Sequence, residues 1–370
     1  MKTRSTFFLM SALGLLLVGC ITIVAPPDTS SDDPITEVIT DADEKKYTEK
    51  FQVNNRYKVR LMKKCAPRVW LHSDEKYWPS SVEWSFNFTQ RVWRKDNHWW
   101  LVTRQKLKKP SSVLPYFHGC DPNQQHTGIP CNFDEVPAYA FWNEVDIAGE
   151  GKNVVDIVYF FYYPYNRGKK AVNTIFGSHV GDWEHVTVRL YWQQSNKTGK
   201  WLLAPAQGAG TVSIYIAAHD FGGTNGWNEV PKVRGTEHPI VYAAWGSHGT
   251  WKEAGNFTYK KIIMKTKKLI DRTNEGTAWD TWKNLEMFDY NSKKGLGPTW
   301  RGSWPTWMEK DNGSQAMGGQ DPTSGPVYRW GNPKSGKVRY GLKKKSVYYR
   351  LVDGPVGPVD KGYWNTPDLD

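Results

Sequence analysis

The chain has 370 residues, a formal net charge of +12 at pH 7 and an aromatic fraction of 14%, with 20 Trp among its residues. This length is enough for a large hydrophobic core, and the aromatic content favours a folded, β-rich protein over a disordered chain. The positive charge favours anionic surfaces as partners, but no recognised nucleic-acid motif accompanies it, so nucleic acid is not expected as a partner.

The first twenty residues predict export. Lys2 and Arg4 precede an apolar run over residues 7–18, which has the length of a secretory signal and is short for a membrane span. Leu-Val-Gly-Cys at the end of this run also fits a bacterial lipobox, in which Cys20 would carry lipid. We therefore expect a secreted or extracellular protein, with a membrane-anchored lipoprotein as the alternative. Residues 21–42 are rich in Pro, Ser, Thr and Asp and are predicted to be a flexible tether.

After the tether, the hydrophobic pattern predicts one helix followed by a series of strands. Tyr57 and Leu61 at i, i+4 spacing favour a helix within residues 43–64 that ends before Pro67, although alternation in the same segment also fits a strand. Later runs are rich in β-branched and aromatic residues, and residues 154–163 have the composition of a central strand. The predicted strands cover residues 68–71, 82–88, 99–102, 154–163, 183–191, 211–217 and 239–245.

The cysteines and glycosylation sequons agree with an exported protein. Cys120 and Cys131 flank a polar loop, and in an oxidising compartment we expect them to form a disulfide, which leaves Cys65 free or with another partner. Asn-x-Ser/Thr sequons would accept glycans in a eukaryotic secretory route, which makes the protein a candidate glycoprotein. The sequons are at Asn87, Asn196, Asn256 and Asn312.

Short strands separated by Gly, Asn and Ser clusters predict an all-β fold, a β-sandwich with long loops and an N-terminal helix. We expect residues 43–370 to form this single domain. Residues 291–340 have a loop-like composition, but Trp304, Trp307 and Trp330 within them predict that the segment packs onto the body of the domain.

The segment GSHVGDWEHVTVRL, residues 177–190, contains the candidate metal site. On a strand, Asp182 and Glu184 project to the same side, and His179 stands on the turn just before them. Two carboxylates held this close repel each other, and a bound cation relieves the repulsion. Oxygen ligands suit Ca²⁺ or Mg²⁺, while the histidine leaves Mn²⁺ or Zn²⁺ open. Turn capping by Asp182, with ordinary surface pairs at the other two residues, is the alternative.

Further polar residues stand near strand ends and extend the candidate site. Asn166 offers a neutral oxygen to the metal, and it is a turn residue on the alternative interpretation. His219 and His248 each stand where a strand passes into a glycine-bearing loop, so they are candidate ligand-binding residues or hydrogen-bonded loop histidines. His185, on the opposite face of its strand, is also a candidate. No Ser or Cys nucleophile motif such as G-x-S-x-G is present.

Several of these stretches resemble the vacuolar protein sorting-associated protein 62 family. They are spread over nearly the whole chain beyond the tether, and the family's name defines no biochemical activity. The resemblance therefore implies a relation over most of the chain and little about chemistry. The matching stretches are residues 66–84, 159–166, 178–190, 242–251, 269–282 and 353–365.

The stretch SHVGDWEHV is also similar to the GHRHDWE-type heptapeptide of the necrosis- and ethylene-inducing peptide-like toxins, secreted β-sandwich proteins that act at plant membranes. In those toxins the His, Asp and Glu of the heptapeptide and an upstream Asp hold a divalent cation needed to bind sphingolipid sugar headgroups. By position, His179, Asp182 and Glu184 match these ligands, Asn166 falls near the upstream Asp, and His219 near a further histidine. Val-Gly replaces Arg-His inside the heptapeptide and Asn166 is neutral, so the resemblance implies weaker metal binding and a different headgroup, and it does not imply toxin activity.

Three functions follow from these observations. The first is a secreted or surface-tethered protein that binds glycan or lipid headgroups through a divalent cation and acts at membranes. The second is a metal-dependent hydrolase, with Glu184 as general base and His179 and His248 among the catalytic residues. The third is a structural or interaction role. An enzyme is the less expected outcome, the family resemblance adds the vacuolar or endomembrane lumen as a location, and the oligomeric state is not indicated.

Overall fold

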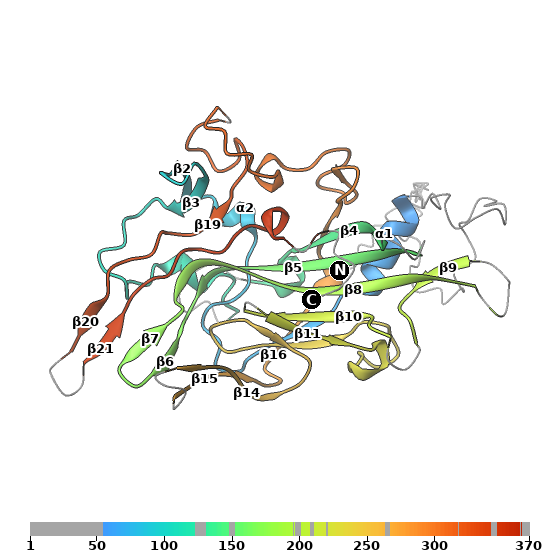
Figure 1. The fold of residues 1–370 in the computed structure, drawn as a ribbon, viewed down its shortest axis with the longest axis horizontal. Helices are drawn as coiled ribbons and strands as arrows, with labels where there is room; N and C mark the ends of the chain where they lie inside the picture. The colour runs from blue at the N-terminus through green and yellow to red at the C-terminus, as the bar shows by residue number, and fades with distance from the viewer. Residues whose placement is uncertain are drawn as a thin grey trace, which may run out of the picture. The chain divides into compact units, whose positions relative to one another are not determined.

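In the computed structural model, strand β5 (Lys152–Asn166) runs through the middle of the protein (Figure 1). Its sequence is almost continuously apolar and aromatic, as expected for a strand that is covered on both faces. The described residues all belong to one compact unit. The structure describes residues 55–122, 131–147, 152–194, 196, 201–207, 211–219, 221–262, 267–316, 318–341, 346–362 and 364.

An eight-stranded sheet forms around β5. β5 pairs antiparallel with β8 (His179–Gln194) on one side and with β4 (Ala138–Ile147) on the other. The strand order is β11-β10-β8-β5-β4-β17-β18, and β9 pairs with β8. The remaining strands of this sheet are β9 (Trp201–Ala204), β10 (Ile214–Ala218), β11 (Phe221–Asn225), β17 (Leu285–Asp289) and β18 (Lys294–Gly295).

One face of this sheet is covered by a second sheet, in the order β13-β12-β1-β16. Phe161 of β5 packs against Trp279 of β16, with ring centroids 5.5 Å apart. Helix α1 (Asn55–Lys64) is attached to β5, because the Tyr159 hydroxyl donates a hydrogen bond to the Met62 carbonyl. The predicted β-sandwich with an N-terminal helix is therefore confirmed. The strands of the second sheet are β1 (Arg68–Leu71), β12 (Ile240–Ala243), β13 (Thr250–Trp251) and β16 (Thr277–Asp280).

The opposite face of the large sheet is covered by the C-terminal part of the chain. Phe160 of β5 belongs to the same buried cluster as Trp304, Trp307 and Trp330. Residues 291–340 thus pack onto the domain, as predicted from their tryptophans. Trp330 also lies in a three-stranded sheet, order β19-β3-β2. Its strands are β2 (Thr89–Trp93), β3 (Trp99–Thr103) and β19 (Arg329–Trp330).

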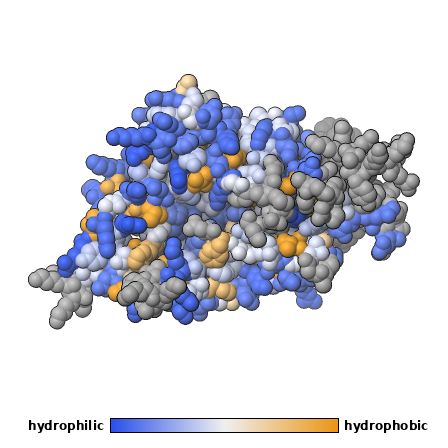
Figure 2. All heavy atoms as spheres, in the orientation of Figure 1, coloured by the Kyte–Doolittle hydropathy of each residue, from blue (hydrophilic) through white to orange (hydrophobic). Residues whose placement is uncertain are grey.

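Two smaller sheets complete the described fold. β14 (Gly255–Ile262) and β15 (Lys267–Thr273) form a hairpin. A four-stranded sheet has the order β20-β21-β7-β6. On the face drawn in Figure 2, hydrophilic residues predominate and hydrophobic residues form separate patches. The strands of the four-stranded sheet are β6 (Lys169–Ala171), β7 (Thr174–Phe176), β20 (Val338–Tyr340) and β21 (Val347–Tyr349).

The prediction of a strand over residues 82–88 is wrong, because the segment begins with the short helix α2 (Val82–Ser85) and β2 starts only at Thr89. Ser81 caps this helix, and its side-chain oxygen accepts a hydrogen bond from the Trp84 N–H. The alternating apolar pattern fits a strand, but this local side-chain hydrogen bond favours the helical turn. The other predicted strands overlap β1, β3, β5, β8, β10 and β12.

The predicted helix is confirmed for its described part. α1 buries Tyr57 and Leu61 on one face and ends before Pro67. Residues 43–54, like the predicted signal and tether over residues 1–42, lie outside the described residues. Among the residues that the structure describes, no helix has the length and apolar character needed to cross a bilayer. All four sequon asparagines are exposed, and glycosylation stays a prediction.

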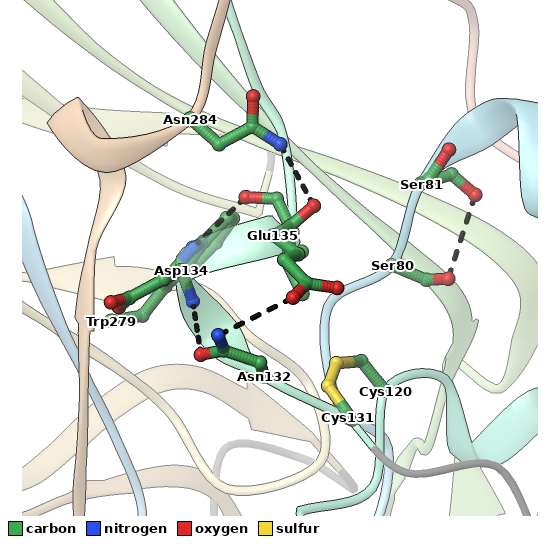
Figure 3. Close-up of a disulfide and its surroundings, with 10 residues drawn as sticks. Ser80, Ser81, Cys120, Cys131, Asn132, Asp134, Glu135, Trp279 and Asn284 are labelled. Carbon is green, nitrogen blue, oxygen red and sulfur yellow. Dashed lines mark hydrogen bonds between the residues drawn. A yellow bond between two sulfur atoms is a disulfide. The ribbon is translucent and has the colours of Figure 1, made fainter. Parts of the chain in front are cut away.

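The predicted disulfide between Cys120 and Cys131 is confirmed, with the two Cα atoms 5.3 Å apart. Figure 3 shows it beside the short 3₁₀ turn η2 (Phe133–Glu135), which leads into β4. Cys65 is free and buried. Burial raises the pKa of the Cys65 thiol to about 12.

Replacing Trp330 with alanine should lower the free energy of unfolding by about 3 to 5 kcal/mol, because a large buried ring is lost from the core. Trp330 is 1% exposed, and its ring packs against those of Phe86, Tyr162 and Trp183. Denaturant unfolding followed by circular dichroism measures the change. Phe221→Ala is the control, since Phe221 is 40% exposed. Equally small effects for both variants would show that the C-terminal segment contributes little to the core.

The raised pKa of Asp360 predicts that the free energy of unfolding depends on pH. Burial, with the nearby charge of Asp311, raises the pKa of Asp360 to about 7. The folded protein thus holds a proton that the unfolded chain releases, so the unfolding free energy falls as pH rises from about 4 to about 7. Asp360→Asn should stabilise the protein on the order of 1 kcal/mol at about pH 8 and leave it unchanged near pH 4. Unfolding curves at both pH values test this, and an effect that is independent of pH would contradict it.

Candidate functional site

The candidate site lies where β5 ends and β8 begins. The register of this antiparallel pair places Asn166 opposite His179 and Tyr163 opposite Asp182. Side chains alternate along a strand, so Asp182 and Glu184 project to the same face, as the sequence predicts. This is the face covered by the second sheet, because Tyr163 stacks on a residue of the loop that follows β12.

A glycine brings β8 close to the C-terminal segment at this point. Gly181 has a φ of +66°, which favours glycine. A Cβ at this position would lie 2.3 Å from the Trp330 carbonyl oxygen, a distance that two backbones cannot accommodate. The Gly between His179 and Asp182 is therefore required by packing, and it sets the direction in which Asp182 leaves the strand.

His179 is held with one ring nitrogen directed at Asp182. Its Nδ1 lies 2.6 Å from the Gly181 carbonyl oxygen, which can only accept, so Nδ1 carries the proton. Nε2 then has the lone pair and lies 3.9 Å from Asp182 Oδ1. Burial lowers the pKa of His179 and favours the neutral ring. A neutral histidine whose tautomer is fixed by a backbone carbonyl is the usual form of a metal-ligating histidine.

His248 lies on the other side of Asp182. Its Nδ1 is 2.9 Å from Asp182 Oδ2, and its ring stacks on Tyr163 at a centroid distance of 3.9 Å. The ring is fully buried, and Nε2 has no hydrogen-bond partner but lies 3.9 Å from Glu75 Oε1. His248 has a φ of 59°, a left-handed conformation that is strained for a non-glycine residue. The structure thus joins β8 to the β12–β13 loop through Asp182.

Neutral oxygen atoms and a second carboxylate complete the surroundings of Asp182. Asn166 donates its amide to the Gly177 carbonyl, and its Oδ1 is buried without a hydrogen-bond partner. The Tyr163 hydroxyl is buried in the same way. Burial raises the pKa of Tyr163, and the charges of Glu184, Asp182 and Glu75 raise it further.

The donor set fits a divalent cation in its chemistry. It offers two carboxylates, an amide oxygen without a partner and an imidazole lone pair, a set that suits Ca²⁺, Mg²⁺ or Mn²⁺. Within the described ranges, however, no three His, Cys, Asp or Glu side chains converge closely enough to form a metal-binding group. The metal site over His179, Asp182, Glu184 and Asn166 therefore stays a prediction.

His219 belongs to a second polar cluster, centred on Asp271 of β15. His219 Nε2 lies 2.8 Å from Asp271 Oδ2, and Lys169 Nζ lies 3.3 Å from Oδ1. Ser247 and Trp251 also donate hydrogen bonds to this carboxylate. Asp271 is fully buried; burial alone would raise its pKa, but His219 and Lys169 lower it. Because Ser247 precedes His248, this cluster supports the loop that carries His248.

His185 lies apart from these two clusters. It projects to the opposite face of β8, where its ring contacts Phe160 and Tyr215. Burial lowers its pKa well below the ordinary value. Sequence reasoning missed Asp271, Lys169 and Glu75 as neighbours of the site, because Asp271 and Glu75 reach it from distant segments and none of the three stands in a motif.

Asp271→Asn should lower the free energy of unfolding by about 3 to 5 kcal/mol, since it leaves the Lys169 ammonium buried without its counter-charge. Combining it with Lys169→Met should recover part of the loss, which a double-mutant cycle in chemical denaturation measures. Asp134→Asn is the control, because the pair of Asp134 with Lys283 is exposed and should contribute less than about 1 kcal/mol. Equal losses for the two Asp variants would contradict the proposed importance of Asp271.

Comparison with known proteins identifies relatives over most of the chain. Residues 18–287 match the family model described as vacuolar protein sorting-associated protein 62. Two Saccharomyces cerevisiae proteins named as vacuolar protein sorting-associated are similar: TDA6, at 26% identity, and protein 62, at 23%. Each comparison covers 80% of this chain, which spans 65% and 64% of the lengths of these relatives.

Solved structures with some likeness include necrosis- and ethylene-inducing proteins. One is protein 2 from the causal agent of cocoa's Witches Broom disease, at 13% identity and a TM-score of 0.26, covering 64% of this chain and 74% of that chain. Another is NLPPya in complex with glucosamine, at 11% identity and a TM-score of 0.23. This comparison covers 60% of this chain and 82% of that chain. TM-scores this low carry no function from those proteins to this one.

Proposed function

Because the chain belongs to the vacuolar protein sorting-associated protein 62 family, whose name defines no chemistry, we propose a function from the candidate site itself: divalent-cation-dependent binding of glycan or lipid headgroups. The observation that carries the proposal is the contact between His179 and Asp182. Two groups that can only accept a proton, His179 Nε2 and Asp182 Oδ1, face each other at 3.9 Å. A positive ion or a water between them would satisfy both.

The residues around Asp182 would orient such an ion and its ligand. His248 donates to Oδ2 of Asp182 and leaves Oδ1 directed at His179. Asn166 Oδ1 is a further acceptor without a partner. A bound divalent cation would neutralise the buried carboxylates and offer its open positions to hydroxyl oxygens. Sugar and lipid headgroups carry such hydroxyls, so they are the proposed ligand class.

We place this function outside the cytosol. The signal-like residues 1–20 and the Cys120–Cys131 disulfide support passage through an oxidising secretory route. The yeast relatives named for vacuolar protein sorting support an endomembrane or vacuolar lumen as the location. Secretion and lipid anchoring at Cys20 are the alternatives.

The proposal predicts that Asp182→Asn weakens cation binding by at least about 100-fold, since it removes a ligand charge while keeping the side-chain volume. Calorimetric titration of the chelator-treated full chain with Ca²⁺, Mg²⁺ and Mn²⁺ measures the loss. The same variant should lose binding to panels of glycans and lipid headgroups, as should the wild type in chelator. Asp134→Asn is the matched control, because its carboxylate is exposed and pairs with Lys283.

Two outcomes would separate the alternatives. Headgroup binding that is unchanged both by chelator and by Asp182→Asn would rule out the proposed function. A metal-dependent hydrolase would instead convert a ligand, and Glu184→Gln would abolish turnover while binding persisted. Turnover that is lost in this variant would replace the binding function with the enzymatic one.

A further inference from the structure

Positive charge is concentrated toward the end of the β14–β15 hairpin that lies away from Asp271. The register places Lys261 directly opposite Lys268 and Ile262 opposite Lys267. Residues 255–268 contain five lysines and no Asp or Glu. Like charges directly opposite across an antiparallel pair are destabilising. Lys260, Lys261, Lys267 and Lys268 are all exposed, so they are available to an anionic partner.

Aromatic residues stand at the base of the same hairpin. Phe257 of β14 stacks on Trp251 at 4.2 Å, with the two rings 7° from parallel. Phe221, at 40% exposure, lies 6.1 Å from Trp251. Trp251 donates its indole N–H to Asp271, which anchors this aromatic cluster to the domain. Aromatic rings beside exposed lysines are typical of surfaces that bind at a bilayer interface.

The hairpin is connected to the candidate site. Lys169 of β6 contacts Asp271 of β15, and β6 and β7 form the hairpin between Asn166 and His179 (Figure 1). β7 in turn pairs with β21. The β20–β21 hairpin adds Arg339, which is exposed and stands opposite Tyr348. These contacts link β15, through β6 and β7, to the β20–β21 hairpin and to the start of β8.

We propose that the β14–β15 hairpin binds the surface of an anionic phospholipid bilayer, and that this contact brings the candidate site to the membrane. The role of the site in that step rests on the proposed headgroup-binding function, whereas the contact of the hairpin with the bilayer does not. Each lysine near an anionic bilayer strengthens binding about fivefold. The lysines of the two strands together make the hairpin a polybasic surface, and the aromatic cluster would lie at the headgroup level.

Vesicle cosedimentation of the full chain tests this inference. Vesicles of phosphatidylcholine alone are compared with vesicles containing roughly 30% phosphatidylserine, in chelator and at about 0.15 M salt. We expect binding only to the phosphatidylserine vesicles. Lys260→Glu with Lys261→Glu should weaken it by at least about 25-fold, the product of about fivefold for each lysine.

A second pair of lysine substitutions and a variant of the candidate site serve as controls for vesicle binding. Lys63→Glu with Lys64→Glu makes the same change in net charge at exposed lysines of α1 and should keep vesicle binding within about threefold of the wild type. In chelator, Asp182→Asn should keep the binding to phosphatidylserine vesicles that depends on the hairpin lysines, whereas without chelator it should lose the cation-dependent headgroup binding, so the two proposals fail separately. Equal losses for the two lysine pairs, or binding to phosphatidylcholine alone, would overturn the inference. So would tight binding to DNA with none to vesicles.

Discussion

The pairing of β5 with β8 is the interaction on which the rest of the fold depends. It spans both strands, and both of their faces are buried, one under the second sheet and the other under the C-terminal tryptophans. A slip of one residue in this register would turn every side chain to the wrong face, so the double burial fixes the register. The fixed register then places Asn166, His179 and Asp182 together at one end of the pair.

Asp271 has a comparable role outside the large sheet. A fully buried carboxylate is costly unless it is paired, and this one receives donors from β6, the β12–β13 loop, β13 and the turn that follows β10. Those segments carry Lys169, Ser247 and His219. The cluster therefore connects the β14–β15 hairpin to the loop that holds His248.

Much of the fold could be predicted from the sequence, because local patterns determine it. The aromatic run over residues 154–163 lies within β5, and the position of Cys120 and Cys131 on either side of a polar loop predicted their disulfide. The segment of α2 was mistaken for a strand because its short alternation resembles one, whereas the cap from Ser81 decides its conformation. The alternation along β8 correctly placed Asp182 and Glu184 on one face. Partners from distant segments, such as Glu75, could not be predicted, because only the folded chain brings them close.

The free cysteine has a consequence for how this chain matures. Cys65 is enclosed by protein, and burial raises the pKa of its thiol to about 12, so the thiol stays protonated at neutral pH. Thiol–disulfide exchange requires the thiolate, so the folded protein cannot use Cys65 to attack its own bridge. The buried Cys65 thiol therefore does not threaten the Cys120–Cys131 bridge once folding is complete. Exchange between Cys65 and the bridge is therefore limited to the time before folding buries the thiol.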